Sequence, residues 1–265
     1  MRYPDVPGLR LSRDEPTLTI AFDRPAQRNS FTPAIAAALR DALIESSHDA
    51  HLRVVVLRGS GTEAFSAGYD IPALAELAGQ GIRPLEPTDP YEQANLALLH
   101  HPLPTVAMLH GWVMGGGCAL SMGCDIRLAG GSARFAMPTA KLGVLYGDQD
   151  LAPFLDAIGS AWTRYLFMTG RVIDASTALR IGLVHEVVPD ELLEAAVQDL
   201  ARELAGNAPL SVRGTKRVLN LMRLGPHAEA RAEIQRLMHQ AQHSDDLEEG
   251  RQAFLEKRRP RFQGR

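Results

Sequence analysis

Two segments rich in small residues have the pattern needed to bind an anion with backbone groups alone. Phe65–Ile71 follows an apolar run that predicts a buried strand, Val54–Leu57, and His110–Cys118 follows a second such run, Thr105–Leu109. A strand that enters a helix through small residues leaves N–H groups at the turn without acceptors. If two such turns face each other, two N–H groups point at one oxygen. The pattern therefore predicts an oxyanion hole, which stabilises an enolate or a tetrahedral anion formed from a carbonyl.

The residues around these segments predict alternating strands and helices. Leu18–Phe22 and Asp125–Ala129 have the apolar pattern of strands. Thr32 is expected to cap a helix that begins at Pro33, because proline suits the first helical position. Gly117–Gly123 is small and apolar on every side, so a helix there is expected to be buried. Strands that alternate with helices predict an α/β fold.

The last third of the chain is expected to be helical. Four amphipathic segments follow one another there: Glu191–Leu204, Ser211–Leu224, Ala228–Gln242 and Asp245–Glu256. Ser244 is placed to cap the last of them. A helical appendage on an α/β core favours an oligomer interface. Earlier in the chain, the glycines and prolines of residues 78–90 indicate a loop that covers a site as a lid.

Composition narrows the class of protein. The 265 residues are 45% hydrophobic and 22% charged with a net charge of −3, which is ordinary for a globular enzyme and gives no general attraction to nucleic acid. No apolar run approaches the roughly 20 residues of a membrane span, and the N-terminus lacks the apolar region of a signal peptide. The only two cysteines, Cys118 and Cys124, suggest neither a disulfide framework nor a metal site. We expect a cytoplasmic protein without a membrane or nucleic-acid partner.

Five motifs together resemble the crotonase superfamily, the enoyl-CoA hydratase/isomerase group. They lie at residues 23–30, 65–71, 111–120, 182–188 and 254–262, in the order in which that family has them, and so cover nearly the whole chain. The resemblance implies a crotonase, or ClpP-like, α/β spiral of ββα units in residues 1–200. It also implies a C-terminal helical oligomerisation region in residues 201–265, which builds a homotrimer or a hexamer.

The same resemblance assigns roles to residues. It places the two oxyanion-hole N–H donors on Tyr69 and Gly116. It implies coenzyme A as part of an acyl-CoA substrate, with no separate cofactor and no metal. Six residues are expected to contact the coenzyme A portion or the turn that holds it: Arg24, Arg28, Ala67, Asp70, Phe254 and Lys257. Phe254 and Lys257 match a tail motif that reaches the coenzyme A of a neighbouring subunit in the family.

The chain departs from the family where hydratases carry two catalytic glutamates. Those positions are Ala119 and Thr139 here. Neither side chain acts as a carboxylate base at neutral pH. Standard two-glutamate hydration is therefore not expected.

Two residues are candidates to handle protons instead. Asp148 resembles an aspartate of the 6-oxocamphor hydrolase-like branch, which cleaves cyclic β-diketones, and a carboxylate beside an apolar segment is expected to have a raised pKa. Tyr146 resembles the tyrosine of methylmalonyl-CoA decarboxylase-like members. The alternative for the aspartates is that Asp148 or Asp150 caps a helix beginning near Leu151. The alternative for Tyr146 is that it lines the wall of the site without a catalytic role.

Three functions follow. The first is an acyl-CoA lyase or isomerase that works through a stabilised enolate. The second is a C–C hydrolase of a cyclic β-diketone, a small carbonyl substrate that needs no coenzyme A. The third is a non-catalytic acyl-CoA-binding protein. Affinity for coenzyme A separates the first from the second.

Overall fold

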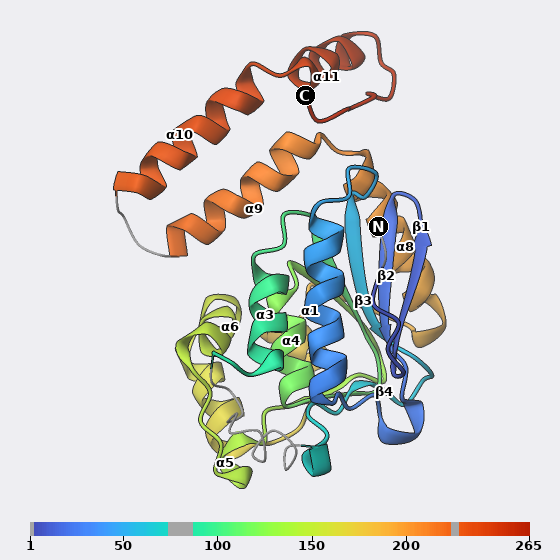
Figure 1. The fold of residues 1–265 in the computed structure, drawn as a ribbon, viewed down its shortest axis with the longest axis vertical. Coiled ribbons are helices and arrows are strands. Elements are labelled where there is room, and N and C mark those ends of the chain that lie inside the picture. Colours follow the sequence, from blue (N-terminus) through green and yellow to red (C-terminus); the bar gives the residue numbers. More distant parts are fainter. Residues whose placement is uncertain (1–2, 74–86, 224–227) are drawn as a thin grey trace.

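A six-stranded sheet runs through the centre of the computed structural model, which describes residues 3–73, 87–223 and 228–265 (Figure 1). Its strands, in spatial order, are β1 (Leu9–Asp14), β2 (Thr17–Phe22), β3 (Val54–Gly59), β5 (Thr105–Leu109), β7 (Ile126–Gly130) and β10 (Glu186–Val188). Only β1 is antiparallel to its neighbour. A second sheet contains β4 (Ala64–Ser66), β6 (Trp112–Met114), β8 (Arg134–Ala136) and β9 (Ile173–Asp174).

From β3 to β8 the strands of the two sheets alternate along the chain, and a helix follows each of these pairs. The helices of the core are α1 (Pro33–Ser47), α3 (Pro90–Leu99), α4 (Gly116–Gly123), α5 (Thr139–Leu142), α6 (Asp148–Thr169), α7 (Ala175–Ile181) and α8 (Asp190–Gly206). The pairs β3–β4, β5–β6 and β7–β8 lead into α3, α4 and α5 in turn. The predicted α/β spiral of ββα units is confirmed.

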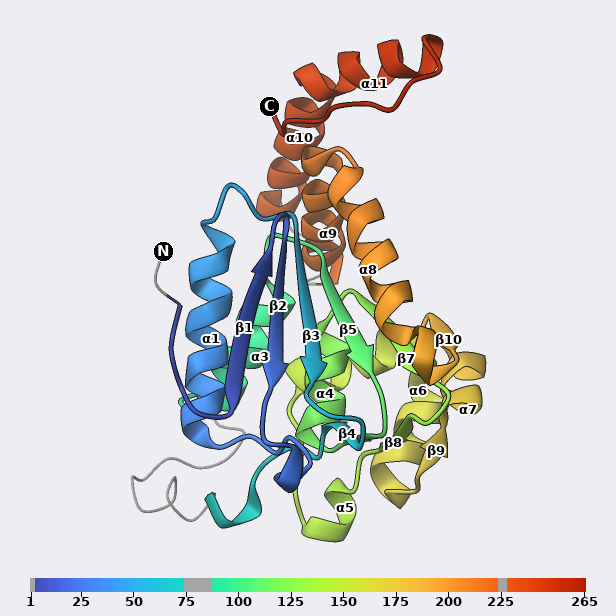
Figure 2. The same ribbon diagram turned by 90° about the vertical axis from the view of Figure 1, so that its right-hand side faces the viewer.

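Helices cover the large sheet on both faces (Figure 2). α1, α3 and α4 pack on one face around a core that includes Leu39, Leu57 and Leu98, whereas α8 covers the other through Leu193 and Val197. The buried β3 and β5 are almost continuously apolar, as expected for parallel strands covered on both faces.

The predicted caps of two helices are confirmed. The Thr32 hydroxyl accepts from the Ile35 N–H at the start of α1, and the Ser244 hydroxyl accepts from the Leu247 N–H at the start of α11 (Asp245–Leu255). Each cap provides an acceptor for one of the N–H groups that the first helical turn leaves unpaired.

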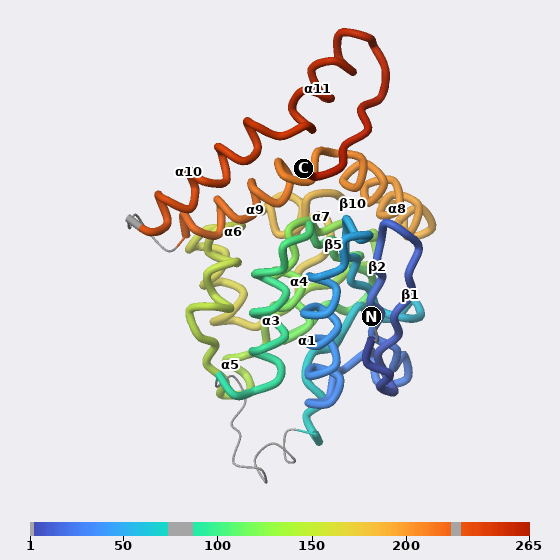
Figure 3. Tube along the Cα trace, turned by 45° about the horizontal axis from the view of Figure 1, so that its top comes forward, coloured from blue at the N-terminus to red at the C-terminus, as the bar shows by residue number. Residues whose placement is uncertain are grey.

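The last three helices stand away from the core (Figures 1 and 3). α9 (Pro209–Arg223) and α10 (Ala228–Gln242) run alongside each other, and α11 lies beyond them. Lys216 fastens α9 to the core, because its Nζ lies 2.7 Å from Asp125 Oδ2 and 3.1 Å from the Leu103 carbonyl oxygen. No described helix has the length and apolarity to cross a membrane.

Two expectations reach beyond the described residues. Leu224, the expected end of one helix, lies outside them, as do residues 78–86 of the expected lid. Of that loop the structure describes only residues 87–90, where Asp89 caps α3 by accepting from the Tyr91 N–H.

Candidate functional site

The two small-residue turns come into direct contact. Gly68, two residues after β4, has a φ of +87°, which side-chain-bearing residues rarely adopt. A β-carbon at Gly68 would lie 2.9 Å from the Gly116 nitrogen and 2.9 Å from the Met114 carbonyl oxygen. The absence of a side chain at Gly68 therefore allows the first turn to reach the start of α4.

The backbone leaves the two expected donors without backbone acceptors in the described part of the chain. Around the first turn, the Phe31 N–H donates to the Gly68 carbonyl and the Asp70 N–H donates to the Phe31 carbonyl, each over 3.0 Å. The intervening amide, on Tyr69, has no such bond. Gly116 is the first residue of α4, so its N–H has no acceptor inside the helix. The structure thus brings both N–H groups to one place.

An aromatic cluster supports this contact. The rings of Phe31 and Tyr91 stack with centroids 5.4 Å apart, and the Tyr69 ring lies 5.2 Å from each. Tyr91 Oη donates to the Gly116 carbonyl over 3.1 Å, which fixes the start of α4. Tyr69 Oη donates to Asp89. Burial, and then this bond, raise the pKa of Tyr69.

The expected N-terminal contact residues mostly bind one another. Arg24 Nη1 lies 2.8 Å from Asp70 Oδ2 and also donates to the Ser30 carbonyl. The Ala67 N–H donates to the carbonyl of the exposed Arg28. Together these bonds hold residues 67–70 in place, which positions the Tyr69 amide.

The expected tail residues lie far from this site within one chain. Phe254 is 83% exposed on α11, and Lys257 follows that helix, whereas β4 lies at the opposite end of the molecule (Figure 1). The structure therefore does not bring Phe254 and Lys257 to the site of their own chain.

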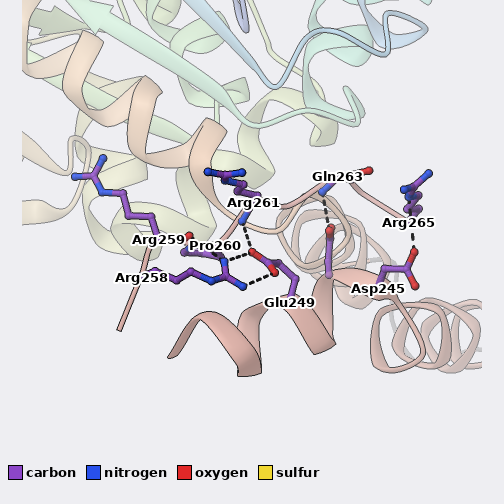
Figure 4. Close-up of a pocket in the computed structure, with 9 residues that line it drawn as sticks. Asp245, Glu249, Arg258, Arg259, Pro260, Arg261, Gln263 and Arg265 are labelled. Carbon is purple, nitrogen blue, oxygen red and sulfur yellow. Dashed lines mark hydrogen bonds and ion pairs between the residues drawn. The ribbon is translucent and has the colours of Figure 1, made fainter. Parts of the chain in front are cut away.

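Two arginines of the basic tail, Arg258 and Arg265, lie near acids of their own region. Figure 4 shows a hollow of about 690 Å³ where Glu249 on α11 accepts from Arg258 at 2.6 and 2.9 Å and from the Arg261 N–H at 2.7 Å. Arg265 lies 3.7 Å from Asp245. These bonds engage Arg258 and Arg265, which reduces the positive charge that the tail presents to a phosphate.

The two glutamate positions of the resembled family are buried without a carboxylate. Ala119 is 3% exposed in α4. Thr139 begins α5, and its hydroxyl donates to the Phe167 carbonyl over 3.3 Å. Neither residue supplies an acid or a base.

Helix α6 begins earlier than predicted. It starts at Asp148 rather than near Leu151, and its N-cap is Gly147, so neither Asp148 nor Asp150 is the capping residue. Asp148 is exposed on the first turn. Gly147 takes the N-cap position because its backbone is extended there, directly before the helical run. The helix dipole favours acidic residues in a first turn, which suits both aspartates.

Tyr146 is buried against the aromatic cluster. It is 7% exposed, contacts Phe167 edge-to-face at 6.0 Å and hydrogen-bonds to Tyr91. Burial is the main cause of its raised pKa. Tyr146 thus connects through Tyr91 to Gly116, while the exposed Asp148 does not.

Two buried carboxyl groups were missed by the sequence reasoning. Glu92 on α3 and Asp150 on α6 are 6% and 2% exposed and hydrogen-bond to each other. Asn95 Nδ2 also donates to Asp150 Oδ1 over 2.6 Å. Burial, followed for Glu92 by the negative charge of Asp150, raises the pKa of both carboxyls. The sequence signal that could have indicated this site is the pair Glu92 and Asn95, two polar residues one helical turn apart among the buried residues of α3.

The described residues contain neither a metal-binding cluster nor an ionised cysteine. No cluster of three or more His, Cys, Asp or Glu residues is arranged there to hold a metal ion. Burial raises the pKa of Cys118 and of Cys124 to about 12, so both remain thiols at neutral pH.

Comparisons with known proteins agree along nearly the whole chain. The model of the family described as enoyl-CoA hydratase/isomerase matches residues 13–265. Carnitinyl-CoA dehydratase from Salmonella arizonae is 36% identical over 263 residues, which cover 97% of this chain and 98% of that protein.

Solved structures are similar over the same length. An enoyl-CoA hydratase from Bacillus anthracis has a TM-score of 0.87 at 29% identity, covering 97% of this chain and 100% of that one. An enoyl-CoA hydratase/carnithine racemase from Magnetospirillum magneticum has a TM-score of 0.89 at 28% identity, covering 99% and 98%.

Proposed function

The chain belongs to the enoyl-CoA hydratase/isomerase family, and from this premise we propose that it is an enzyme that forms an enolate from an acyl-CoA thioester. The N–H groups of Tyr69 and Gly116 bind the thioester oxygen. Removal of a proton from the carbon next to the thioester places negative charge on that oxygen, where two fixed donors stabilise it.

The contact between the two turns is the observation that carries this proposal. Gly68 lies against the Gly116 nitrogen, and the Tyr91 hydroxyl fixes the Gly116 carbonyl. Donors held in place before the reaction cost no reorganisation when charge develops, and one such donor contributes about 10²–10³ in rate.

The reaction class is a lyase or isomerase reaction other than two-glutamate hydration. Ala119 and Thr139 leave both family positions without a carboxylate, and a general acid or base contributes roughly 10²–10⁴-fold. The similarity to carnitinyl-CoA dehydratase makes carnitinyl-CoA a sensible first substrate to test.

Phe254 and Lys257 fit this function only through an assembly. Both are exposed at the end of the molecule remote from the turns. In a homotrimer or hexamer they contact the coenzyme A bound by the adjacent copy.

Deuterium exchange tests the proposal. The protein is incubated in D₂O with a set of acyl-CoA thioesters, carnitinyl-CoA and cyclic β-diketones, and exchange at the carbon next to the carbonyl is followed by mass spectrometry. We expect coenzyme-A-dependent exchange and slow hydration of a short enoyl-CoA. Cleavage of a diketone without affinity for coenzyme A would instead support the hydrolase, although the exposed Asp148 does not favour it.

A further inference from the structure

We propose that Glu92 and Asp150 form a proton relay that contacts the acyl group and performs the proton transfer for which Ala119 and Thr139 lack a carboxylate. This inference rests on the proposed function, because it names the acid–base group of the same site.

Glu92 and Asp150 form a hydrogen-bonded polar site between two helices. Glu92 comes from α3 and Asp150 from α6, 58 residues later, and Asn95 on α3 donates to Asp150. Glu92 Oε1 is buried, and no described group donates a hydrogen bond to it. A buried oxygen without a partner is costly unless a ligand or water satisfies it. Glu92 Oε1 is thus the atom available to a substrate.

The surroundings allow only one charge on the pair. Within the described chain, neither carboxyl forms an ion pair with a Lys, Arg or His residue. The groups that face the pair are acidic or neutral: Asp89, Asp148, Tyr69, Tyr91 and Tyr146, with Cys118 of α4 beyond Tyr146. Two adjacent buried carboxyls without a cation retain a proton between them. The relay requires this proton to start on Glu92, which then donates it to the Asp150 carboxylate.

The relay lies next to the oxyanion turn. Tyr91, the residue before Glu92, donates to the Gly116 carbonyl over 3.1 Å and also bonds to Tyr146. The same turn of α3 therefore holds the start of α4 and carries the unpartnered Glu92 oxygen.

The proton transfer balances without a co-reactant. Glu92 Oε1 takes a proton from the carbon next to the thioester as the C–H bond breaks, and its second oxygen passes its own proton to Asp150. The electron pair moves into the enolate, whose oxygen is held by the two N–H groups. Reversal returns a proton to the same carbon, which gives exchange, or to a more distant carbon of the conjugated enolate, which gives isomerisation.

Two isosteric variants test the relay. Glu92→Gln and Asp150→Asn each keep a hydrogen-bonding group of the same size but lose one transfer step. Asp156→Asn is the matched control, because it removes a half-exposed carboxylate from the same helix, α6. Exchange with the best acyl-CoA, its dissociation constant, and the infrared carbonyl band of a buried protonated carboxyl group at pH 7 are measured for each protein.

We expect both relay variants to lose about 10²–10⁴-fold in exchange rate, with nearly unchanged acyl-CoA affinity. The carboxyl band is expected in the wild-type protein and in Asp156→Asn but not in Glu92→Gln. Full exchange by both relay variants overturns the proposal, as does loss of exchange in Asp148→Asn alone. If the wild-type protein binds no acyl-CoA and exchanges nothing, the proposed function fails and the catalytic role fails with it, whereas the infrared band separately reports whether the pair holds a proton.

Discussion

Gly116 contributes to the site through its amide N–H. Two substitutions can separate the effect of losing this N–H from the effect of adding a side chain. A β-carbon there would lie 2.9 Å from Phe31 and 3.3 Å from Tyr91. Gly116→Ala adds this carbon and keeps the N–H, whereas Gly116→Pro adds it and removes the N–H at a position that helices tolerate for proline. We expect the proline variant to be about 10²–10³-fold slower than the alanine variant in deuterium exchange. Equal rates in two folded variants would show that this N–H is not a donor to the anion.

Glu92 also predicts how stability depends on pH. Burial, together with Asp150, raises its pKa from 4.5 to about 8 in the folded protein. Between these values the folded protein keeps a proton that the unfolded chain loses, so this carboxyl makes the protein less stable as the pH rises. Glu92→Gln removes the effect. The free energy of unfolding is measured with urea at pH 5 and at pH 8. We expect it to fall less between these pH values in the variant than in the wild-type protein. An equal fall in both proteins would contradict the burial of a carboxyl group without a cation.

The sequence predicts the backbone part of this site better than its side-chain part. Gly68 and Gly116 lie in local motifs, so their turns are recognisable without the fold. Glu92 and Asp150 are 58 residues apart and belong to no common motif, and only the fold, which brings the first turn of α6 within hydrogen-bond distance of α3, joins them. Asp148, the aspartate that the motif favours, is exposed two residues before the buried Asp150, a difference that depends on where α6 begins.

At the level of elements, the contact between the first turn and α4 depends on Gly68. Gly68→Ala places a carbon 2.9 Å from backbone atoms and strains a φ of +87°. We expect this variant to lose both stability and activity, with a destabilisation of about 1–3 kcal/mol. Gly131→Ala is the control, since a β-carbon there meets nothing within 4 Å. Comparable thermal unfolding of the two variants would show that the turns do not need this close approach.

Helices were predicted more accurately than the short strands. Thr32 and Ser244 mark their helix starts through hydroxyl groups that the sequence shows directly. The strands β4, β6 and β8 have only three residues each, too few for a periodic pattern, and their pairing is entirely non-local. The pattern of residues therefore did not predict the second sheet. The ββα repeat that contains it was expected only from the family resemblance.

At the scale of the whole molecule, the C-terminal helices present apolar side chains outward. Leu219, Met222, Met238, Phe254 and Leu255 are each more than half exposed. Exposed apolar surface of this kind marks interaction sites, so we expect a trimer or hexamer in sedimentation analysis at micromolar concentration. Removal of residues 225–265 is expected to give smaller species with weaker coenzyme A affinity. A monomeric full-length protein would contradict this expectation.

The attachment of α9 to the core has a further consequence for local unfolding. Lys216 and Asn220 tie α9 to the carbonyl groups of Leu103 and Leu99 and to Asp125, whereas α10 packs mainly along α9, farther out. Regions with few buried contacts open at a lower free energy than the whole protein does. Amide hydrogens should therefore exchange with solvent fastest in α10 and α11, more slowly in α9 and slowest in β3 and β5. The outer helices can thus open and close again while the central sheet, and the turns that it holds, stay folded.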